Sequence, residues 1–327
     1  MATNEWRRVI VEPALFYLIW RGVRPTAAET WRIVDAFVLG GLLIALIGLG
    51  QYVTGTNLIE AEGGVMRLRS IYGSPNNVAL FLGRVWPLLA AVFLLGDGRR
   101  RWWYGAAAVP IGLAILLSFS KGALLLGVPG STLLVLGVWQ WRRGGRIWPW
   151  VVAGLGGVAA VFLIGQQIPA LATRLDPRSA TGIFRLQLWQ ASLNMVREHP
   201  WFGVGLDNFL YAYRGRYILS AAWQEPNLNH PHNIFLDFAT RLGLLGVVSG
   251  GWLVGSAVWG LGRKVVRGEW LVARGEYALA VGLLGGLVHM LLHGLVDHSF
   301  FLVDLAFAFY LAAAVGSAEG AGEAEER

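Results

Sequence analysis

The feature that most constrains this chain is a series of long apolar runs separated mainly by short basic segments. The runs lie at residues 33–53, 76–96, 102–119, 122–139, 147–166, 241–261, 277–296 and 300–316, with a weaker one at 9–20. A helix crosses the hydrocarbon core of a bilayer with about 20 mostly apolar residues. The sequence therefore predicts an all-α polytopic membrane protein with about eight or nine transmembrane helices.

Composition supports this class. Of the 327 residues, 55% are hydrophobic and only 14% are charged, whereas a soluble domain usually carries about a quarter charged residues. The 16 tryptophans and 44 glycines suit membrane interfaces and close helix packing. A net charge of +7 is compatible with nucleic-acid binding, but most Arg and Lys lie between the apolar runs. That placement predicts no nucleic-acid partner, and the absence of cysteine excludes thiol chemistry.

The positive charges predict the orientation. They gather in alternate connections, at Arg21, Arg24 and Arg32, at Arg99, Arg100 and Arg101, at Arg142, Arg143 and Arg146, and at Arg263, Lys264, Arg267 and Arg274. The positive-inside rule places these connections in the cytoplasm. The prediction is a transmembrane bundle at 1–166, an extracytoplasmic catalytic loop at 167–240, further transmembrane helices at 241–316 and a disordered cytoplasmic tail at 317–327. Arg7 and Arg8 would lie outside the cytoplasm, against this rule, if the weak run at 9–20 crosses the membrane. An interfacial position for that run would remove the conflict.

The loop at 167–240 is where chemistry is expected, because connections longer than about 12–15 residues are usually functional or disordered. Its Gly182–His199 segment has the pattern of an amphipathic helix, with one face formed by Ile183, Leu186, Leu193 and Val196 and another by Arg185, Trp189 and Ser192. Two interpretations of Arg185 stay open. It anchors an interfacial helix to headgroups, or it binds the phosphate of a lipid-linked substrate.

Two histidines, His230 and His232, flank a proline near the end of the loop. Such a pair can ligate metal, but no cysteine or clustered carboxylate completes a set nearby in the sequence, so we predict no metal site and no cofactor. Histidine is the side chain best suited to exchange a proton near neutral pH. For an isolated histidine, helix capping or an interfacial position would be the favoured role.

Other polar side chains interrupt the apolar runs. Arg84 would cost at least about 2.5–3.5 kcal/mol at membrane depth, so it needs a partner, either a substrate phosphate or a buried carboxylate such as Asp304. A polar stripe at helical spacing continues toward the outer surface at His289, His293, Asp297 and His298. The spacing favours polar packing between helices over a second active site.

Five motifs occur in order: Ile71-Tyr-Gly-Ser-Pro-Asn-Asn77, Ser120-Lys-Gly-Ala123, Arg185-Leu-Gln-Leu-Trp189, His199-Pro-Trp-Phe-Gly-Val-Gly205 and His232-Asn-Ile-Phe-Leu-Asp-Phe-Ala-Thr-Arg-Leu-Gly-Leu-Leu-Gly246. Together they resemble the C-terminal domain shared by O-antigen ligases, O-antigen polymerases and protein O-oligosaccharyltransferases. The His-Asn pair, nine residues and Gly-x-x-Gly form the most specific part. The resemblance covers roughly residues 30–316 and implies a helical bundle like that of GT-C glycosyltransferases.

The resemblance implies a glycosyltransferase of the bacterial inner membrane, acting in lipopolysaccharide or polysaccharide biosynthesis. Its members move a glycan from undecaprenyl pyrophosphate to a lipid, glycan or protein hydroxyl on the extracytoplasmic face, without an obligatory metal. By resemblance, His232 is the catalytic histidine and Arg185 contacts the donor pyrophosphate. Lys121 stands where the family has a second arginine, which keeps the charge but loses the bidentate geometry. Further substrate-binding candidates are Arg84, Asn233 and His230.

Several alternatives remain open from the sequence. The motifs do not separate a ligase from a polymerase or from a protein O-oligosaccharyltransferase. A transporter or flippase of lipid-linked glycans would need ionisable groups at the midplane and broken helices in paired halves. An intramembrane hydrolase lacks support, since neither Gly-x-Ser-x-Gly nor His-Glu-x-x-His is present. Members of the family tend to have more spans, so a truncated or inactive member, or a structural subunit, is also possible.

Overall fold

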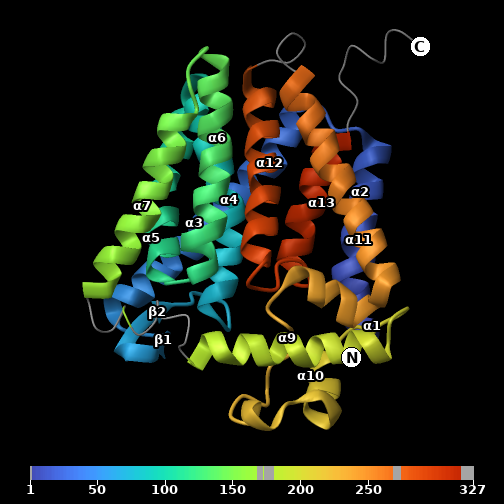
Figure 1. Cartoon of the computed structure of the whole chain (residues 1–327). Helices are drawn as coiled ribbons and strands as arrows, with labels where there is room; N and C mark the ends of the chain where they lie inside the picture. Colours follow the sequence, from blue (N-terminus) through green and yellow to red (C-terminus); the bar gives the residue numbers. More distant parts are fainter. Residues whose placement is uncertain (1, 168–171, 173–179, 268–273, 318–327) are drawn as a thin grey trace.

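The structure is a computed structural model that describes all residues except 1, 168–171, 173–179, 268–273 and 318–327. Its helices are α1 (Ala2–Glu5), η1 (Trp6–Val11), α2 (Glu12–Val23), α3 (Ala27–Thr54), η2 (Glu62–Gly64), α4 (Pro75–Leu95), α5 (Gly98–Leu117), η3 (Ala123–Gly127), α6 (Val128–Arg142), α7 (Trp148–Gln167), α9 (Ala180–Glu198), α10 (Phe209–Ala212), η4 (Tyr213–Tyr217), η5 (Ser220–Ala222), α11 (Ile234–Arg267), α12 (Arg274–Gly294) and α13 (Val303–Ser317). An antiparallel hairpin pairs β1 (Leu58–Ala61) with β2 (Val65–Leu68). Helices form an upright bundle (Figure 1), so the all-α polytopic fold is confirmed.

Each of the eight apolar runs corresponds to a helix. Among the described residues, six helices are long and apolar enough to cross a membrane: Ala27–Thr54, Pro75–Leu95, Ala123–Arg142, Trp148–Gln167, Ile234–Arg267 and Gly275–Gly294. The helix Val303–Ser317 is apolar but shorter. The predicted run at 102–119 lies in α5, which carries three arginines near its start and is not among the six.

The weak run at 9–20 belongs to a continuous rod formed by α1, η1 and α2. This rod extends along α13 between the two ends of the bundle (Figure 1). Phe16 packs edge-on against Phe307 with ring centroids 5.8 Å apart. Arg7 therefore lies at the same end of the bundle as α9, where its guanidinium pairs with Glu12 at 3.2 Å. The run stands in the bundle, so an interfacial position does not explain the Arg7–Arg8 exception.

The ends of the bundle differ as the alternation of basic segments predicts. The α4–α5 and α6–α7 connections and the end of α11 lie at one end, and the hairpin, α9 and α10 lie at the other (Figure 1). The basic clusters and the long loop are thus on opposite ends.

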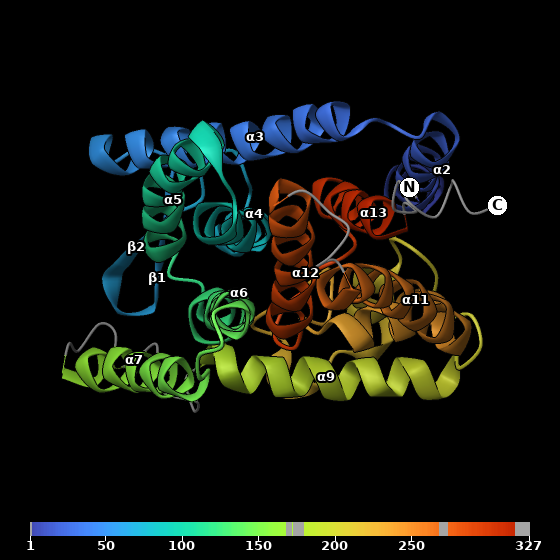
Figure 2. The ribbon, with the colours of Figure 1, turned by 90° about the horizontal axis from the view of Figure 1, so that it is seen from above.

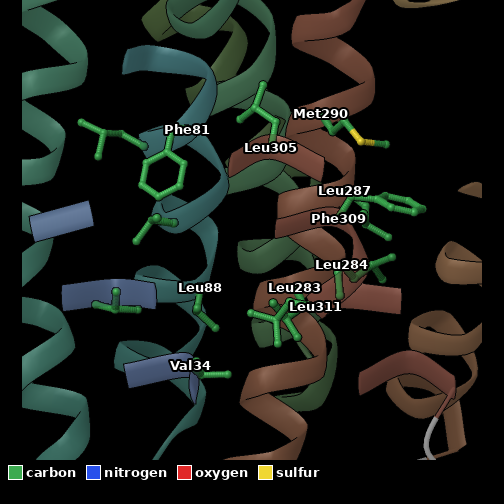
Figure 3. Close-up of a cluster of buried hydrophobic side chains, with 14 of the residues drawn as sticks. Val34, Phe81, Leu88, Leu283, Leu284, Leu287, Met290, Leu305, Phe309 and Leu311 are labelled. Atoms are coloured by element: carbon green, nitrogen blue, oxygen red, sulfur yellow. The ribbon is translucent and has the colours of Figure 1, made fainter. Parts of the chain in front are cut away.

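The core that supports the loop end is formed by α4, α12 and α13 (Figure 3). Its side chains include Leu88, Leu283, Leu287, Met290, Leu305 and Phe309. Gly282 permits a close approach of α12 to α4, since a Cβ there would lie 2.6 Å from Leu88 Cα. Helix pairs in membranes associate through such close packing. The packing fixes the α12–α13 connection against the start of α4.

Helix α9 confirms that the predicted segment Gly182–His199 is helical, but the predicted apolar face is mostly exposed and Ser192, on the other predicted face, is buried. It lies across the loop end of the bundle, nearly perpendicular to the spans and beside α11 (Figures 1 and 2). It buries Leu188, Ala191, Ser192 and Met195, whereas Ile183, Leu186 and Leu193 are exposed. An exposed apolar face on such a helix is typical of a membrane surface.

The predicted boundary between residues 240 and 241 falls inside α11. This helix begins seven residues earlier, at Ile234, because the side chain of Asn233 caps its first turn. Most of the 167–179 segment and the predicted disordered tail from 318 onward lie outside the described residues.

Candidate active site

The centre of the site is Asp297, in the connection between α12 and α13. Its Oδ1 lies 2.9 Å from His232 Nδ1 and also accepts the backbone N–H of His298 at 2.9 Å. The Asp297 side chain is 3% exposed and that of His232 is 20% exposed. The predicted catalytic histidine thus lies against a buried carboxylate 65 residues away in the sequence, with part of its ring open to the surroundings.

A second set of donors holds the other oxygen of Asp297. Asn76 Nδ2, at the start of α4, donates to Asp297 Oδ2 at 2.8 Å. Arg67, at the end of the hairpin, donates to Asn76 Oδ1 at 2.7 Å and to the Ser118 carbonyl at 2.8 Å. The carboxylate is therefore fixed by a chain of hydrogen bonds that reaches the hairpin and the end of α5.

Two further histidines complete the cluster. His230 Nε2 lies 3.2 Å from His232 Nδ1, and the His230 ring stacks on His298 with centroids 3.6 Å apart and planes at 20°. His230 Nδ1 faces the acceptor Asn229 Oδ1 at 2.6 Å, so Nδ1 carries the proton and Nε2 is an acceptor.

The hydrogen-bond pattern selects one tautomer of His232. Its Nδ1 faces two acceptors, Asp297 Oδ1 and His230 Nε2, so the hydrogen belongs on Nδ1. This leaves the Nε2 lone pair available, and no described residue forms a hydrogen bond with it. An imidazole oriented through Nδ1 by a carboxylate is the arrangement in which Nε2 accepts a proton from a substrate hydroxyl.

The charges of the cluster follow from its burial. Burial and the neighbouring His232 lower the pKa of His230 to about 4, so His230 is neutral at neutral pH. Burial alone would raise the pKa of Asp297, but the neighbouring His232 and the hydrogen bond from its Nδ1 hold it well below its usual range. The site therefore contains one stable negative charge beneath His232.

The backbone of the His230–Asn233 segment is held from several sides. Asn233 caps α11, with its Oδ1 accepting from Phe235 N at 3.0 Å and its Nδ2 donating to the Leu295 carbonyl at 3.0 Å. Trp189 on α9 donates to the Pro231 carbonyl at 2.9 Å. His232 itself has a left-handed backbone with φ of 50°. Asn233 was predicted to bind substrate, and these contacts favour a structural role for it.

The His199–Gly205 and Arg241–Gly246 motifs interlock beneath this segment. Gly243 breaks α11 with φ of 67° and ψ of −162°, a conformation that is essentially restricted to glycine. Across the break, Val204 N donates to the Thr240 carbonyl and Leu244 N donates to the Pro200 carbonyl, both at 2.7 Å. These bonds satisfy backbone groups that the break leaves unpaired and fix the loop after α9 to α11.

Replacing Gly243 with alanine should destabilise the protein. The strained backbone costs about 1–3 kcal/mol, and the new Cβ would lie 2.3 Å from the Trp201 carbonyl, so the collision adds to this loss. Thermal unfolding in detergent measures the effect. The matched control is Gly255→Ala on the same helix, where a Cβ would meet nothing within 4 Å. An equal unfolding temperature for the two variants would contradict this explanation of the motif.

Lys121, one of the cations predicted to bind the donor, is in a turn beside His293, which lies four residues before Asp297. Ser120 Oγ is 3.3 Å from His293 Nε2, and a Cβ on Gly122 would lie 2.4 Å from the His293 ring, so the turn that carries Lys121 packs on this histidine. Arg185 is on α9, which crosses the same end of the bundle (Figure 1). The structure therefore places Lys121 beside α12 and Arg185 on the helix that crosses the end of the bundle where Asp297 lies.

Arg84 lies deeper, in α4, and is 5% exposed. Its guanidinium donates to the Leu305 carbonyl at 2.5 Å and to the Ser299 carbonyl. Asp304, the partner considered from the sequence, instead accepts a hydrogen bond from Tyr72 at 2.5 Å. The partners of Arg84 favour a role in fixing the Asp297-bearing connection over contact with a substrate phosphate.

A metal can be considered at His230, Asp297 and His298, because one possible ligand atom from each lies within 4.8 Å of the others. The sequence argument against a metal set had not included the last two residues. However, the rings of His230 and His298 are stacked nearly parallel, so their in-plane lone pairs point side by side instead of converging on one ion.

Sequence reasoning missed the partners of His232. Asp297 and His298 were interpreted as part of a packing stripe, yet they join His230 and His232 in one cluster. His289 and His293 do fit a packing stripe, being fully buried. Apart from His232, only Asn76 among the side chains that bond Asp297 lay in a motif noted in the sequence, and the structure shows that it donates a hydrogen bond to Asp297. No feature of the sequence distinguished Arg67.

Comparison with known proteins supports the family that the motifs resemble. The family model described as O-antigen ligase matches residues 106–249, which contain four of the five motifs. The chain is 25% identical over 234 residues to a general O-oligosaccharyltransferase from Acinetobacter baylyi, an alignment that covers 66% of this chain. The chain spans 38% of the length of that relative. Residues 106–249 therefore match the O-antigen ligase family that the motifs resemble.

Proposed function

We propose that this chain transfers an oligo- or polysaccharide from undecaprenyl pyrophosphate to an acceptor hydroxyl, at the extracytoplasmic face of the bacterial inner membrane. The observation that carries the proposal is the His232–Asp297 pair, at 2.9 Å, at the bundle end opposite the basic connections. The carbonyl of Pro231, the residue before His232, accepts a hydrogen bond from Trp189 on α9, the helix that also bears Arg185. A proton acceptor beside cations at a membrane surface suits an uncharged hydroxyl acceptor and an anionic lipid donor.

The reaction is a single displacement. The acceptor oxygen attacks the anomeric carbon of the glycan, and its proton passes to His232 Nε2. The bond between the anomeric carbon and the phosphate oxygen breaks with its electron pair, and undecaprenyl pyrophosphate leaves. One displacement inverts the configuration at that carbon. Asp297 stabilises the imidazolium that forms on His232 and keeps the ring oriented.

The leaving group needs its negative charge matched. Arg185 and Lys121 would bind the pyrophosphate and stabilise the charge that grows as it leaves. Arginine holds phosphate through paired hydrogen bonds, whereas Lys121 supplies a compact charge. Binding donor and acceptor in one site supplies the remaining advantage through proximity. The mechanism assigns no step to a metal.

The acceptor defines the subclass. The enzyme is a ligase if the acceptor is a lipid core and a polymerase if the acceptor is a growing glycan. It is an O-oligosaccharyltransferase if the acceptor is a protein. The name of the Acinetobacter relative, a general O-oligosaccharyltransferase, supports transfer of an oligosaccharide to an oxygen atom.

A transporter of lipid-linked glycans is the alternative from another class. Its support would be ionisable groups deep in the bundle, such as Arg84 and His289. Arg84, however, is bound to backbone carbonyls. The ring of His289 is close-packed against Gly83, where a Cβ would lie 2.0 Å from it. These contacts indicate that Arg84 and His289 serve to pack the helices. The transferase is therefore the better-supported function.

Donor binding can be tested by native mass spectrometry in nanodiscs with undecaprenyl pyrophosphate-linked glycan. We expect the wild-type chain and Lys121→Arg to bind the donor, and Arg185→Ala to bind it at least about tenfold more weakly, since losing a charged hydrogen bond is costly. Arg197→Ala is the matched control, because Arg197 is an exposed arginine on the same helix. Equal binding by Arg185→Ala and Arg197→Ala would make Arg185 an interfacial anchor only.

A further inference from the structure

Arg241 connects segments that are far apart in the sequence. It lies on α11, two residues before the break at Gly243, and its side chain is only 6% exposed. Its Nε donates to Asp237 Oδ1 at 2.6 Å, its Nη1 to Glu5 Oε1 at 2.5 Å and its Nη2 to the Asn229 carbonyl at 3.3 Å. One guanidinium therefore bonds its own helix, α1 and the residue that precedes His230.

The same guanidinium also contacts the other half of the site. Arg241 Cζ lies 5.0 Å from the centre of the Phe301 ring, a distance at which a cation and an aromatic face attract each other. Phe301 is buried in the α12–α13 connection that carries Asp297. Arg241 thus touches both segments that supply the His232–Asp297 pair.

Glu5 is the remote member of this arrangement. Asp237 is on the same helix as Arg241, one turn away, and is 1% exposed, so it orients the guanidinium locally. Glu5 is 236 residues away in the sequence, and its side chain is 16% exposed. A buried charge without its partner is costly, so this ion pair ties the position of α1 to that of the active-site loop.

We propose that Arg241 and Glu5 are positioning residues, which hold the His232 loop and the Asp297 connection at the separation needed for transfer. This inference rests on the proposed function. A planar guanidinium with five donors suits the role, because it bonds several acceptors in one plane while its face lies against a ring. Neither residue touches the reacting atoms, and they act on His232 through the Asn229 carbonyl and on Asp297 through Phe301.

The test uses the full chain with Glu5→Gln, which removes one charge and leaves the Arg241–Asp237 pair intact. Glu5→Asp is the conservative variant. Glu12→Gln is the matched control, since Glu12 is a half-exposed glutamate on the same rod and pairs only with the exposed Arg7 among the described residues. Arg241→Gln would leave the buried Asp237 unpaired and risks misfolding, so it is a secondary variant.

Hydrogen exchange and kinetics provide independent readouts. For Glu5→Gln we expect faster amide exchange in the 226–233 segment, with α12 unchanged. We also expect kcat lower by about ten- to a hundredfold, as for a displaced catalytic group, with the donor KM unchanged. Glu5→Asp should recover most of the kcat, and Glu12→Gln should match the wild-type chain.

Unchanged exchange in the 226–233 segment, or an unchanged kcat, would overturn the inference. So would equal losses in Glu5→Gln and Glu12→Gln. Exchange does not depend on transfer. A wild-type chain that transfers nothing would therefore contradict the proposed function, while exchange would still decide whether Glu5 holds the loop.

Discussion

Replacing His232 with alanine should lower kcat for glycan transfer by about 10²- to 10⁴-fold, the usual contribution of a general base. Binding of the lipid-linked donor should be almost unchanged, because in the proposed mechanism His232 acts on the acceptor hydroxyl and the cations act on the pyrophosphate. Transfer is measured in proteoliposomes by the glycan attached to the acceptor, and donor binding by native mass spectrometry.

His199→Ala is the matched control for this variant. His199 is an exposed histidine at the end of α9 and lies outside the His232–Asp297 cluster. The His199→Ala variant should transfer glycan at the wild-type rate. A His232→Ala chain that transfers at a rate close to the control would show that this ring is not the proton acceptor.

Replacing Asp297 with asparagine should have a comparable effect, lowering kcat by about 10²- to 10⁴-fold, as when a carboxylate that orients a catalytic histidine is lost. Asp297 accepts from His232, from Asn76 and from the His298 backbone. In one of these contacts, the N–H₂ group of an asparagine would face another N–H donor, so that hydrogen bond would be lost. The substitution would also remove the negative charge that stabilises the imidazolium. The donor KM should change little.

Asp304→Asn is the matched control for Asp297→Asn. Asp304 is at the start of α13, and its carboxylate binds Tyr72. Its replacement should leave kcat within a few-fold of the wild-type value, in the range of ordinary substitutions away from the site. If Asp297→Asn lowered kcat no further than Asp304→Asn, the carboxylate would not be needed to orient His232.

The membrane bundle could be predicted from the sequence because a bilayer imposes a simple condition on each span. About 20 apolar residues are needed for one crossing, and every apolar run corresponds to a helix. The periodicity of the Gly182–His199 segment likewise predicted α9, since helical spacing is a local property. The hairpin of β1 and β2 was not predicted, because its four-residue strands are too short to carry a pattern.

The site could be predicted only in part. His232 and Arg185 were selected by family motifs, but Asp297 lies 65 residues from His232 and 221 from Asn76. Which distant polar groups meet depends on how α4 and α12 pack, and spacing along one helix does not determine that. The stripe from His289 to His298 looked uniform in the sequence. The structure divides it at Gly294, where α12 ends, into packing residues within the bundle and residues of the candidate site.

The break in α11 illustrates a similar limit. The apolar run at 241–261 located the membrane part of this helix, but α11 begins at Ile234 and bends at Gly243. Asp237 precedes this run and Arg241 is its first residue, yet both side chains are buried. Their burial depends on contacts with α1 and with the Asn229 carbonyl, which come from segments remote in the sequence.

The most direct test of the central claim is a transfer assay with the purified chain in proteoliposomes, supplied with undecaprenyl pyrophosphate-linked glycan and candidate lipid, glycan and protein acceptors. We predict that the wild-type chain releases one undecaprenyl pyrophosphate for each glycan attached, in the presence of a chelator, and that His232→Ala does neither. Movement of the intact donor to the other leaflet, without release of undecaprenyl pyrophosphate, would contradict the transferase and favour a transporter.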